Sequence, residues 1–193
     1  MDTNEQQKTV GVGELMARAG ARAVPVVAGI GDAVLSAPTP CAEYDVRSLV
    51  NHLFQVVVEF RKPAVKQDSD FSVTVDRVGE GPDWRERFAG AVAELVAAWS
   101  APGAEEGTSG SMNMPARLVG LMAVLDLTVH AWDLARATGQ PYEAPPEVVA
   151  PLAEAVAELS PTARSMGVFG EPVAVGADAS PFVRLLAATG RGE

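Results

Sequence analysis

Apolar residues recur at spacings of three and four along almost the whole chain, which is the period of amphipathic helices packed around a shared core. Four long segments carry this pattern, over residues 12–35, 45–62, 83–99 and 114–138. The last is the most apolar and stops at Gly139 and Pro141, so we expect it at the centre of the protein. Weaker helices are expected over 146–159 and 180–189. The pattern predicts an all-α fold, a bundle of four principal helices with a C-terminal extension.

Local signals place the ends of these helices and the segments between them. Asp45 and Asp83 stand where N-caps belong, and Pro25 predicts a kink or break in the first segment. Residues 63–82 lose the helical pattern, and 71–75 alternate briefly like a short strand. Because this stretch directly follows the second helix, which carries His52, we expect a long loop or a lid that lies near the open side of a site at His52. No linker is long enough to divide the chain, so residues 1–193 are expected to form a single domain.

Charge and cysteine content exclude several classes of function. The chain has 193 residues, with 15 basic and 25 acidic side chains and a formal net charge of −10. That balance repels phosphate backbones and anionic lipids, which argues against nucleic-acid and membrane partners. The longest apolar runs, such as 118–125, are too short to span a bilayer, and residues 1–10 lack the apolar core of a secretory signal. The single cysteine, Cys41, excludes a disulfide framework, so a cytoplasmic location is expected.

Two histidines, His52 and His130, are the main candidates for chemistry, and both lie in apolar helical stretches. Asp126 precedes His130 by four residues, so both project from one helix face. It is also the only charged residue between Arg117 and Asp133, where an ionised carboxylate is costly unless paired or bound to a cation. Two histidines and one carboxylate converging from facing helices would form a three-ligand metal site with open positions. Asp133 would support this site as an acceptor for an imidazole N–H.

These residues also allow other interpretations. Both histidines could be core residues with satisfied hydrogen bonds, and Asp126 could pair with Arg117. Cys41, just before a helix start, could be an activated thiolate, although small buried cysteines are common. Arg184, in the last expected helix, is the candidate for binding an anionic cofactor or substrate, against the alternative of a surface salt bridge.

Two stretches resemble a known family. The sequences TPCAEYDVRSLVNHL (39–53) and DLTVHAWDLARATG (126–139), with the tail at 168–170 and 179–191, are similar to the actinobacterial metal-binding branch of the DinB/YfiT-like superfamily, which includes mycothiol-dependent maleylpyruvate isomerase. The resemblance implies a DinB-like four-helix bundle with a divalent metal, usually zinc. It also implies that a histidine on the second helix and an acid-x-x-x-His pair on a later one hold this metal, and His52, Asp126 and His130 match those positions. Maleylpyruvate isomerase has glutamate where this chain has Asp126.

The function expected from this resemblance is that of a zinc-dependent transferase or isomerase. Its cosubstrate would be a low-molecular-weight thiol such as mycothiol, and the metal-bound thiolate would be the nucleophile. The other partner would be a small-molecule substrate. Two alternatives stay open: a metal-binding helical module for ligands or partners without catalysis, and non-haem iron chemistry on the same ligands. A homodimer is also left open.

Overall fold

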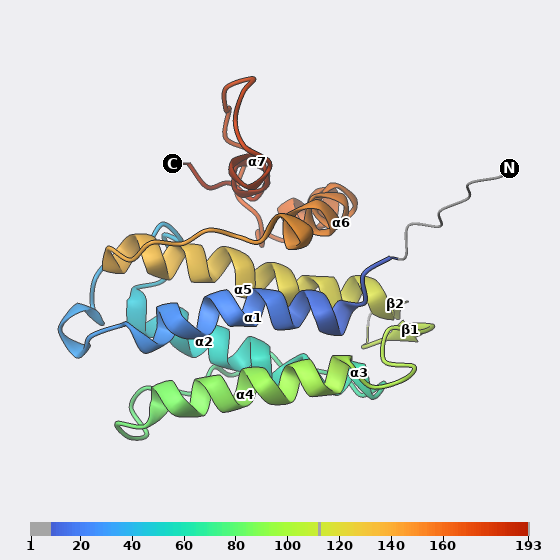
Figure 1. Ribbon diagram of the computed structural model, residues 1–193, viewed down its shortest axis with the longest axis horizontal. Helices are drawn as coiled ribbons and strands as arrows, with labels where there is room; N and C mark the ends of the chain where they lie inside the picture. Colours follow the sequence, from blue (N-terminus) through green and yellow to red (C-terminus); the bar gives the residue numbers. More distant parts are fainter. Residues whose placement is uncertain (1–8, 112, 193) are drawn as a thin grey trace, which may run out of the picture.

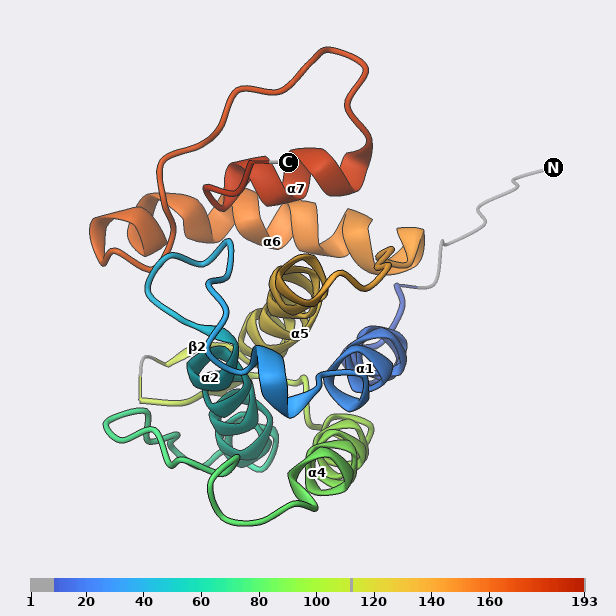
Figure 2. The ribbon, with the colours of Figure 1, turned by 90° about the vertical axis from the view of Figure 1, so that its left-hand side faces the viewer.

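The computed structural model describes residues 9–111 and 113–192, and it is mostly helical. The elements in chain order are α1 (Val12–Ala28), the 3-10 turn Asp32–Val34, α2 (Val46–Glu59), α3 (Arg61–Ala64), α4 (Trp84–Trp99), β1 (Thr108–Ser109), β2 (Met114–Pro115), α5 (Ala116–Thr138), α6 (Pro146–Ser165) and α7 (Pro181–Ala188). Helices α1 and α2 each pack against both α4 and α5, which makes a four-helix bundle (Figures 1 and 2). Helix α6 packs on α5, and α7 packs on α6, as the predicted C-terminal extension. The predicted all-α fold, a four-helix bundle with a C-terminal extension, is confirmed.

Helix α5 is the central helix, as its composition predicts. It is long and apolar enough to cross a membrane by length and composition, but 89% of its most apolar window is buried inside the protein. That burial is typical of the core helix of a bundle. The helix stops at Gly139, which adopts the left-handed conformation (φ 68°) that glycine tolerates best.

Three local predictions differ from the structure. Helix α1 continues through Pro25 without the break that was one of the two expectations there. Pro25 cannot bond to the Ala21 carbonyl, and both residues are exposed, so water can reach that carbonyl. Residues 71–75 form no strand, and the small sheet lies instead between β1 and β2. Helix α6 continues beyond 159 to Ser165. There Gly167 and Val168 donate to the carbonyls of Arg164 and Ala163, which is a Schellman stop.

The N-cap of α2 allows a stability test. Asp45 Oδ1 accepts hydrogen bonds from the Ser48 hydroxyl (2.6 Å) and the Ser48 N–H (2.8 Å), and these bonds hold the pKa of Asp45 below its usual value. Replacing Asp45 with alanine should lower the free energy of unfolding by about 1 kcal/mol at neutral pH. Because the pKa is lower in the folded state, this contribution is present above the unfolded-state pKa and is lost as the pH falls through the folded-state value.

Asp83→Ala is the matched control for this prediction. Asp83 occupies the N-cap of α4, but its side chain makes no cap hydrogen bond. Its replacement should therefore change the free energy of unfolding by at most about 0.5 kcal/mol. Urea unfolding of both variants at neutral and acidic pH measures the difference, and equal losses for the two would contradict the capping role of Asp45.

Candidate metal centre and pocket

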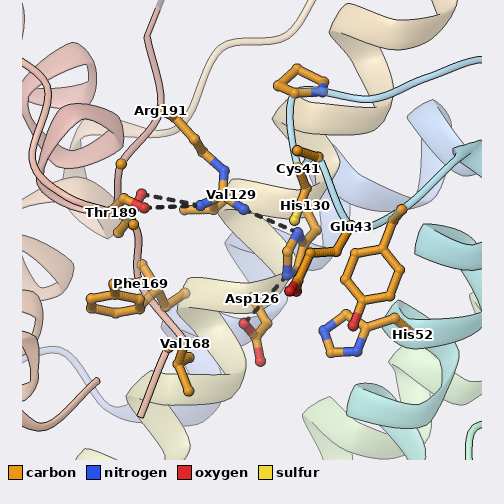
Figure 3. Close-up of a pocket in the computed structure, with 17 residues that line it drawn as sticks. Cys41, Glu43, His52, Asp126, Val129, His130, Val168, Phe169, Thr189 and Arg191 are labelled. Atoms are coloured by element: carbon orange, nitrogen blue, oxygen red, sulfur yellow. Dashed lines mark hydrogen bonds and ion pairs between the residues drawn. The ribbon is translucent and has the colours of Figure 1, made fainter. Parts of the chain in front are cut away.

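A cavity of about 580 Å³ opens where α2, α5, the loop before α2 and the C-terminal segments meet (Figure 3). It lies on the side of the bundle that α6 and α7 cover. Its lining consists of residues 40–44, His52 of α2, four residues of α5 (Leu125, Asp126, Val129 and His130), residues 167–170 and residues 189–191. Segments that are far apart in the chain therefore build one pocket.

Local backbone contacts hold the loops of this pocket in place. The single hydroxyl proton of Thr39 is shared between the carbonyls of Cys41 (3.0 Å from Oγ1) and Tyr44 (2.8 Å), which folds residues 39–44 into a compact turn before α2. On the opposite wall, Gly170 and Gly190 lie in direct backbone contact. A Cβ at Gly190 would lie 2.7 Å from the Gly170 Cα, and Gly190 has a φ of 89°. Both the space and the backbone conformation thus require glycine at 190.

The structure brings His52, Asp126 and His130 together. One potential ligand atom from each residue lies within 4.8 Å of the others. The His52 and His130 rings meet edge to face with centroids 5.0 Å apart, and His130 Nε2 lies 3.8 Å from Asp126 Oδ1. The one-turn spacing of Asp126 and His130 on α5 brings them to one side, and the neighbouring helix α2 supplies His52.

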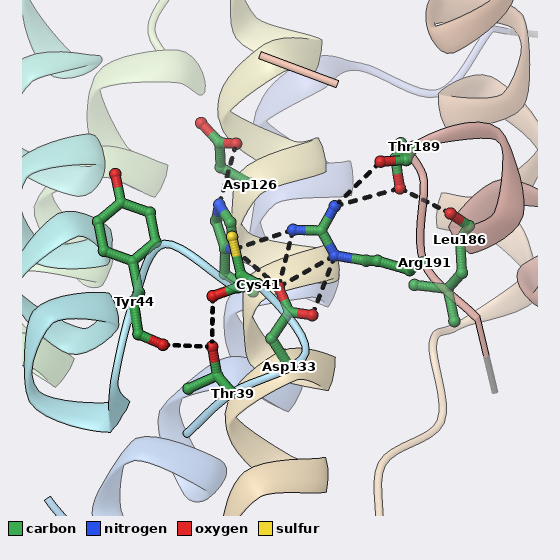
Figure 4. Close-up of polar contacts among 9 residues, drawn as sticks. Thr39, Cys41, Tyr44, Asp126, Asp133, Leu186, Thr189 and Arg191 are labelled. Atoms are coloured by element: carbon green, nitrogen blue, oxygen red, sulfur yellow. Dashed lines mark hydrogen bonds and ion pairs between the residues drawn. The ribbon is translucent and has the colours of Figure 1, made fainter. Parts of the chain in front are cut away.

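Asp133 contacts the outer nitrogen of His130, as the spacing predicts. His130 Nδ1 lies 3.0 Å from Asp133 Oδ2, and since a carboxylate can only accept, Nδ1 carries the proton and Nε2 faces Asp126. Asp133 is fully buried, and Arg191 binds it through Nε (2.9 Å to Oδ1) and Nη2 (2.8 Å to Oδ2) (Figure 4). Burial raises the pKa of Asp133, but the hydrogen bonds from His130 and Arg191 outweigh it and leave the pKa below its usual value.

His52 is held by its neighbour Tyr44. The two rings stack with centroids 5.3 Å apart and an interplanar angle of 20°, which fixes the plane of the imidazole. Burial lowers the pKa of His52, with a further lowering from His130 and an opposing effect of Asp126. His52 is therefore a neutral imidazole at neutral pH, the form that coordinates metals.

Cys41 forms a second cluster with His130 and Asp133, whose potential ligand atoms also lie within 4.8 Å of one another. Burial raises the pKa of the Cys41 thiol, against a lowering by Arg191. A raised pKa does not support the activated thiolate considered from the sequence. The Nδ1 of His130 is also occupied by Asp133, so His130 has only Nε2 free, on the side of Asp126.

Two other sequence-based expectations are not supported by the positions of the residues. Arg184 does not line the pocket: it is exposed and donates to the backbone carbonyls of Ala177 and Ala179, so its position gives no support for cofactor binding. Arg117 pairs with Glu105 (2.5 Å) rather than with Asp126. The arginine that lines the pocket is Arg191, which the sequence analysis did not single out. An indirect indication was available, because Asp133 lies on a helix predicted to be buried and a buried carboxylate requires a cation.

The prediction that residues 63–82 lie at the open side of the site is also wrong. Among the described residues that line the pocket, none comes from 63–82. Three residues at four-residue spacing on α2 bind this loop: Asn51 bonds to Asp76 and Val78, Gln55 bonds to Val73 and Thr74, and Glu59 bonds to Ser69 and Asp70. These contacts hold the loop along another face of the helix. The segments 167–170 and 189–191 take the place at the pocket that was predicted for it.

Comparisons with known proteins identify the fold and the family of this chain. A solved structure described as the crystal structure of the mycothiol-dependent maleylpyruvate isomerase matches with a TM-score of 0.67 and 17% sequence identity, over 94% of this chain and 88% of that one. This likeness shows a shared fold. A comparison with curated proteins finds no match. The family model described as the mycothiol maleylpyruvate isomerase N-terminal domain matches residues 16–135, which include His52, Asp126, His130 and Asp133. Because this match covers well over half of the sequence, the chain belongs to the family of mycothiol maleylpyruvate isomerase N-terminal domains.

Proposed function

We propose that this protein is a metal-dependent enzyme of the transferase or isomerase type, which uses the thiol mycothiol to act on a small-molecule substrate. The observation that carries the proposal is the convergence of His52, Asp126 and His130 at a pocket of about 580 Å³. That volume lies within the usual range for small-molecule sites. The family match and the description of the matching solved structure support mycothiol as the thiol.

The three side chains fit a divalent metal. Zinc ligands at about 2.0–2.2 Å in a tetrahedron are about 3.4 Å apart, so the 3.8 Å between His130 Nε2 and Asp126 Oδ1 needs to close only slightly. Two neutral imidazoles and one carboxylate form the donor set of a catalytic zinc site, which keeps positions open. A divalent metal bound there would supply Lewis acidity and would lower the pKa of a coordinated thiol, so that the thiol reacts as a thiolate at neutral pH.

The surrounding residues orient these ligands. Tyr44 holds the ring plane of His52, and Asp133 keeps the proton of His130 on Nδ1. Arg191 in turn holds the carboxylate of Asp133. A carboxylate–histidine pair of this kind fixes the direction of the free imidazole nitrogen and raises its basicity.

The thiol-dependent function is tested by adding mycothiol to metal-loaded protein. Cobalt-loaded protein should show new near-ultraviolet absorption, and zinc-loaded protein should accelerate the reaction of mycothiol with chlorodinitrobenzene. The acceleration should fall about 100-fold or more after chelation, because Lewis-acid stabilisation is worth several kcal/mol. Absence of any mycothiol binding would favour the non-catalytic module, and iron in anaerobically purified protein that zinc cannot replace would favour iron chemistry.

Metal removal should leave the bundle folded. The four long helices bury a continuous core that does not depend on the site, unlike small zinc domains that unfold without metal. The helical circular dichroism should persist at room temperature, while Tm should fall by about 5–10 °C relative to protein with free metal at 100 times its Kd. Loss of the helical signal on chelation would contradict this expectation.

A further inference from the structure

The positively charged side chain at the pocket, Arg191, already forms an ion pair within the protein. Among the described residues that line the pocket, Arg191 is the only lysine or arginine. Its guanidinium binds both carboxylate oxygens of Asp133, and its remaining Nη1 lies 3.3 Å from Thr189 Oγ1 and 3.4 Å from the Thr189 carbonyl. Asp133 has no exposed surface, so it cannot leave this pair for water. The one arginine charge among these lining residues is therefore balanced inside the protein.

The other charged side chains of the lining are acids. Glu43 lies on the exposed loop before α2, and Asp126 stands among the proposed metal ligands. A divalent metal would be balanced by Asp126 and a bound thiolate, which leaves Glu43 as the uncompensated charge. A carboxylate or phosphate on the second substrate would meet an acid and no free cation, within a chain whose net charge is −10.

The wall beside the metal ligands is apolar. Leu125 and Val129 come from α5, and Val168 and Phe169 come from the segment after α6. Figure 3 shows Val168 and Phe169 across Asp126 from His52. Val168 is 66% exposed, so much of its surface is free to be covered by a ligand. Burial of an apolar group against this wall would stabilise a complex, whereas burial of an unpaired charge would oppose it.

We propose that the electrophile that reacts with the thiol in this pocket is uncharged and carries an apolar ring or chain, placed against Val168 and Phe169. This inference rests on the proposed function and narrows its substrate class. It excludes dicarboxylate electrophiles as preferred substrates, because the pocket offers them no unpaired cation.

Binding of two matched thioethers tests the inference without requiring turnover. The probes are S-benzyl mycothiol and S-(para-carboxybenzyl) mycothiol, titrated into metal-loaded protein by calorimetry. The benzyl conjugate should bind at least tenfold more tightly. If the carboxylated conjugate binds equally or more tightly, or if neither binds although mycothiol does, the inference is overturned while the proposed function stands. If mycothiol itself does not bind, the proposed function fails and the inference fails with it.

A pair of variants links the preference to the apolar wall. Val168→Arg places a cation at the wall and should reduce the preference for the benzyl conjugate at least fivefold. Met166→Arg is the matched control, because Met166 is also 66% exposed and lies outside the pocket lining. It should leave the preference unchanged. Equal effects of the two variants would show a general response to charge and would overturn the assignment of the wall.

Discussion

Replacement of His52 or His130 with alanine is expected to lower the affinity for a divalent metal by more than about 100-fold. Loss of a supporting residue at a metal site costs about 10- to 100-fold, and loss of one of only three protein ligands should exceed that range. Elemental analysis of protein prepared without chelators or a histidine-rich tag should find about one metal ion per wild-type chain and little in either variant.

Cys41→Ser is the control that separates the two possible clusters. His130 belongs to both, but His52 belongs only to the cluster with Asp126, and Cys41 only to the cluster with Asp133. The position of the His130 proton favours the first cluster, so Cys41→Ser should keep the metal. Equal metal content in wild type and His130→Ala would contradict a site at either cluster. Loss of metal in Cys41→Ser but not in His52→Ala would move the site to Cys41.

Arg191→Met is expected to lower the free energy of unfolding by about 3 kcal/mol. The substitution leaves the fully buried carboxylate of Asp133 without its cation, and breaking a buried pair by removing one partner costs about 3–5 kcal/mol. We expect the lower end of this range because His130 still donates to Asp133. Urea unfolding monitored by circular dichroism measures the change.

Two further variants show whether this loss comes from the buried pair. Arg184→Met changes an arginine in the same C-terminal segment that is exposed and bonds only to backbone carbonyls, so it should cost about 0.5 kcal/mol or less. The double variant Arg191→Met with Asp133→Leu should be more stable than Arg191→Met alone, because no charge is then left buried. Equal losses for Arg184→Met and Arg191→Met would contradict the proposed role of the pair.

Much of the fold could be predicted because its signals are local. The three- and four-residue period identified the bundle helices, Asp45 marked the start of α2, and Gly139 marked the end of α5. The errors arose where a local signal depends on distant atoms. Residues 71–75 alternate like a strand, but Val73 and Thr74 bond to the side chain of Gln55 instead of to a second strand. Alternation alone cannot reveal whether a partner strand exists.

The candidate site divides in the same way. The sequence by itself determined that Asp126, His130 and Asp133 share one side of a helix, because the helical repeat brings residues three and four apart together. Only the tertiary structure decided that His52 meets them edge to face, that Tyr44 stacks on His52, and that Arg191 reaches Asp133 across 58 positions of the chain. The tertiary structure also decided which segments enclose the pocket. Residues 63–82 were predicted to do so, but residues 167–170 and 189–191 line it instead. Contacts between distant segments depend on how the helices pack against one another, and this packing cannot be predicted from the spacing of apolar residues within one helix.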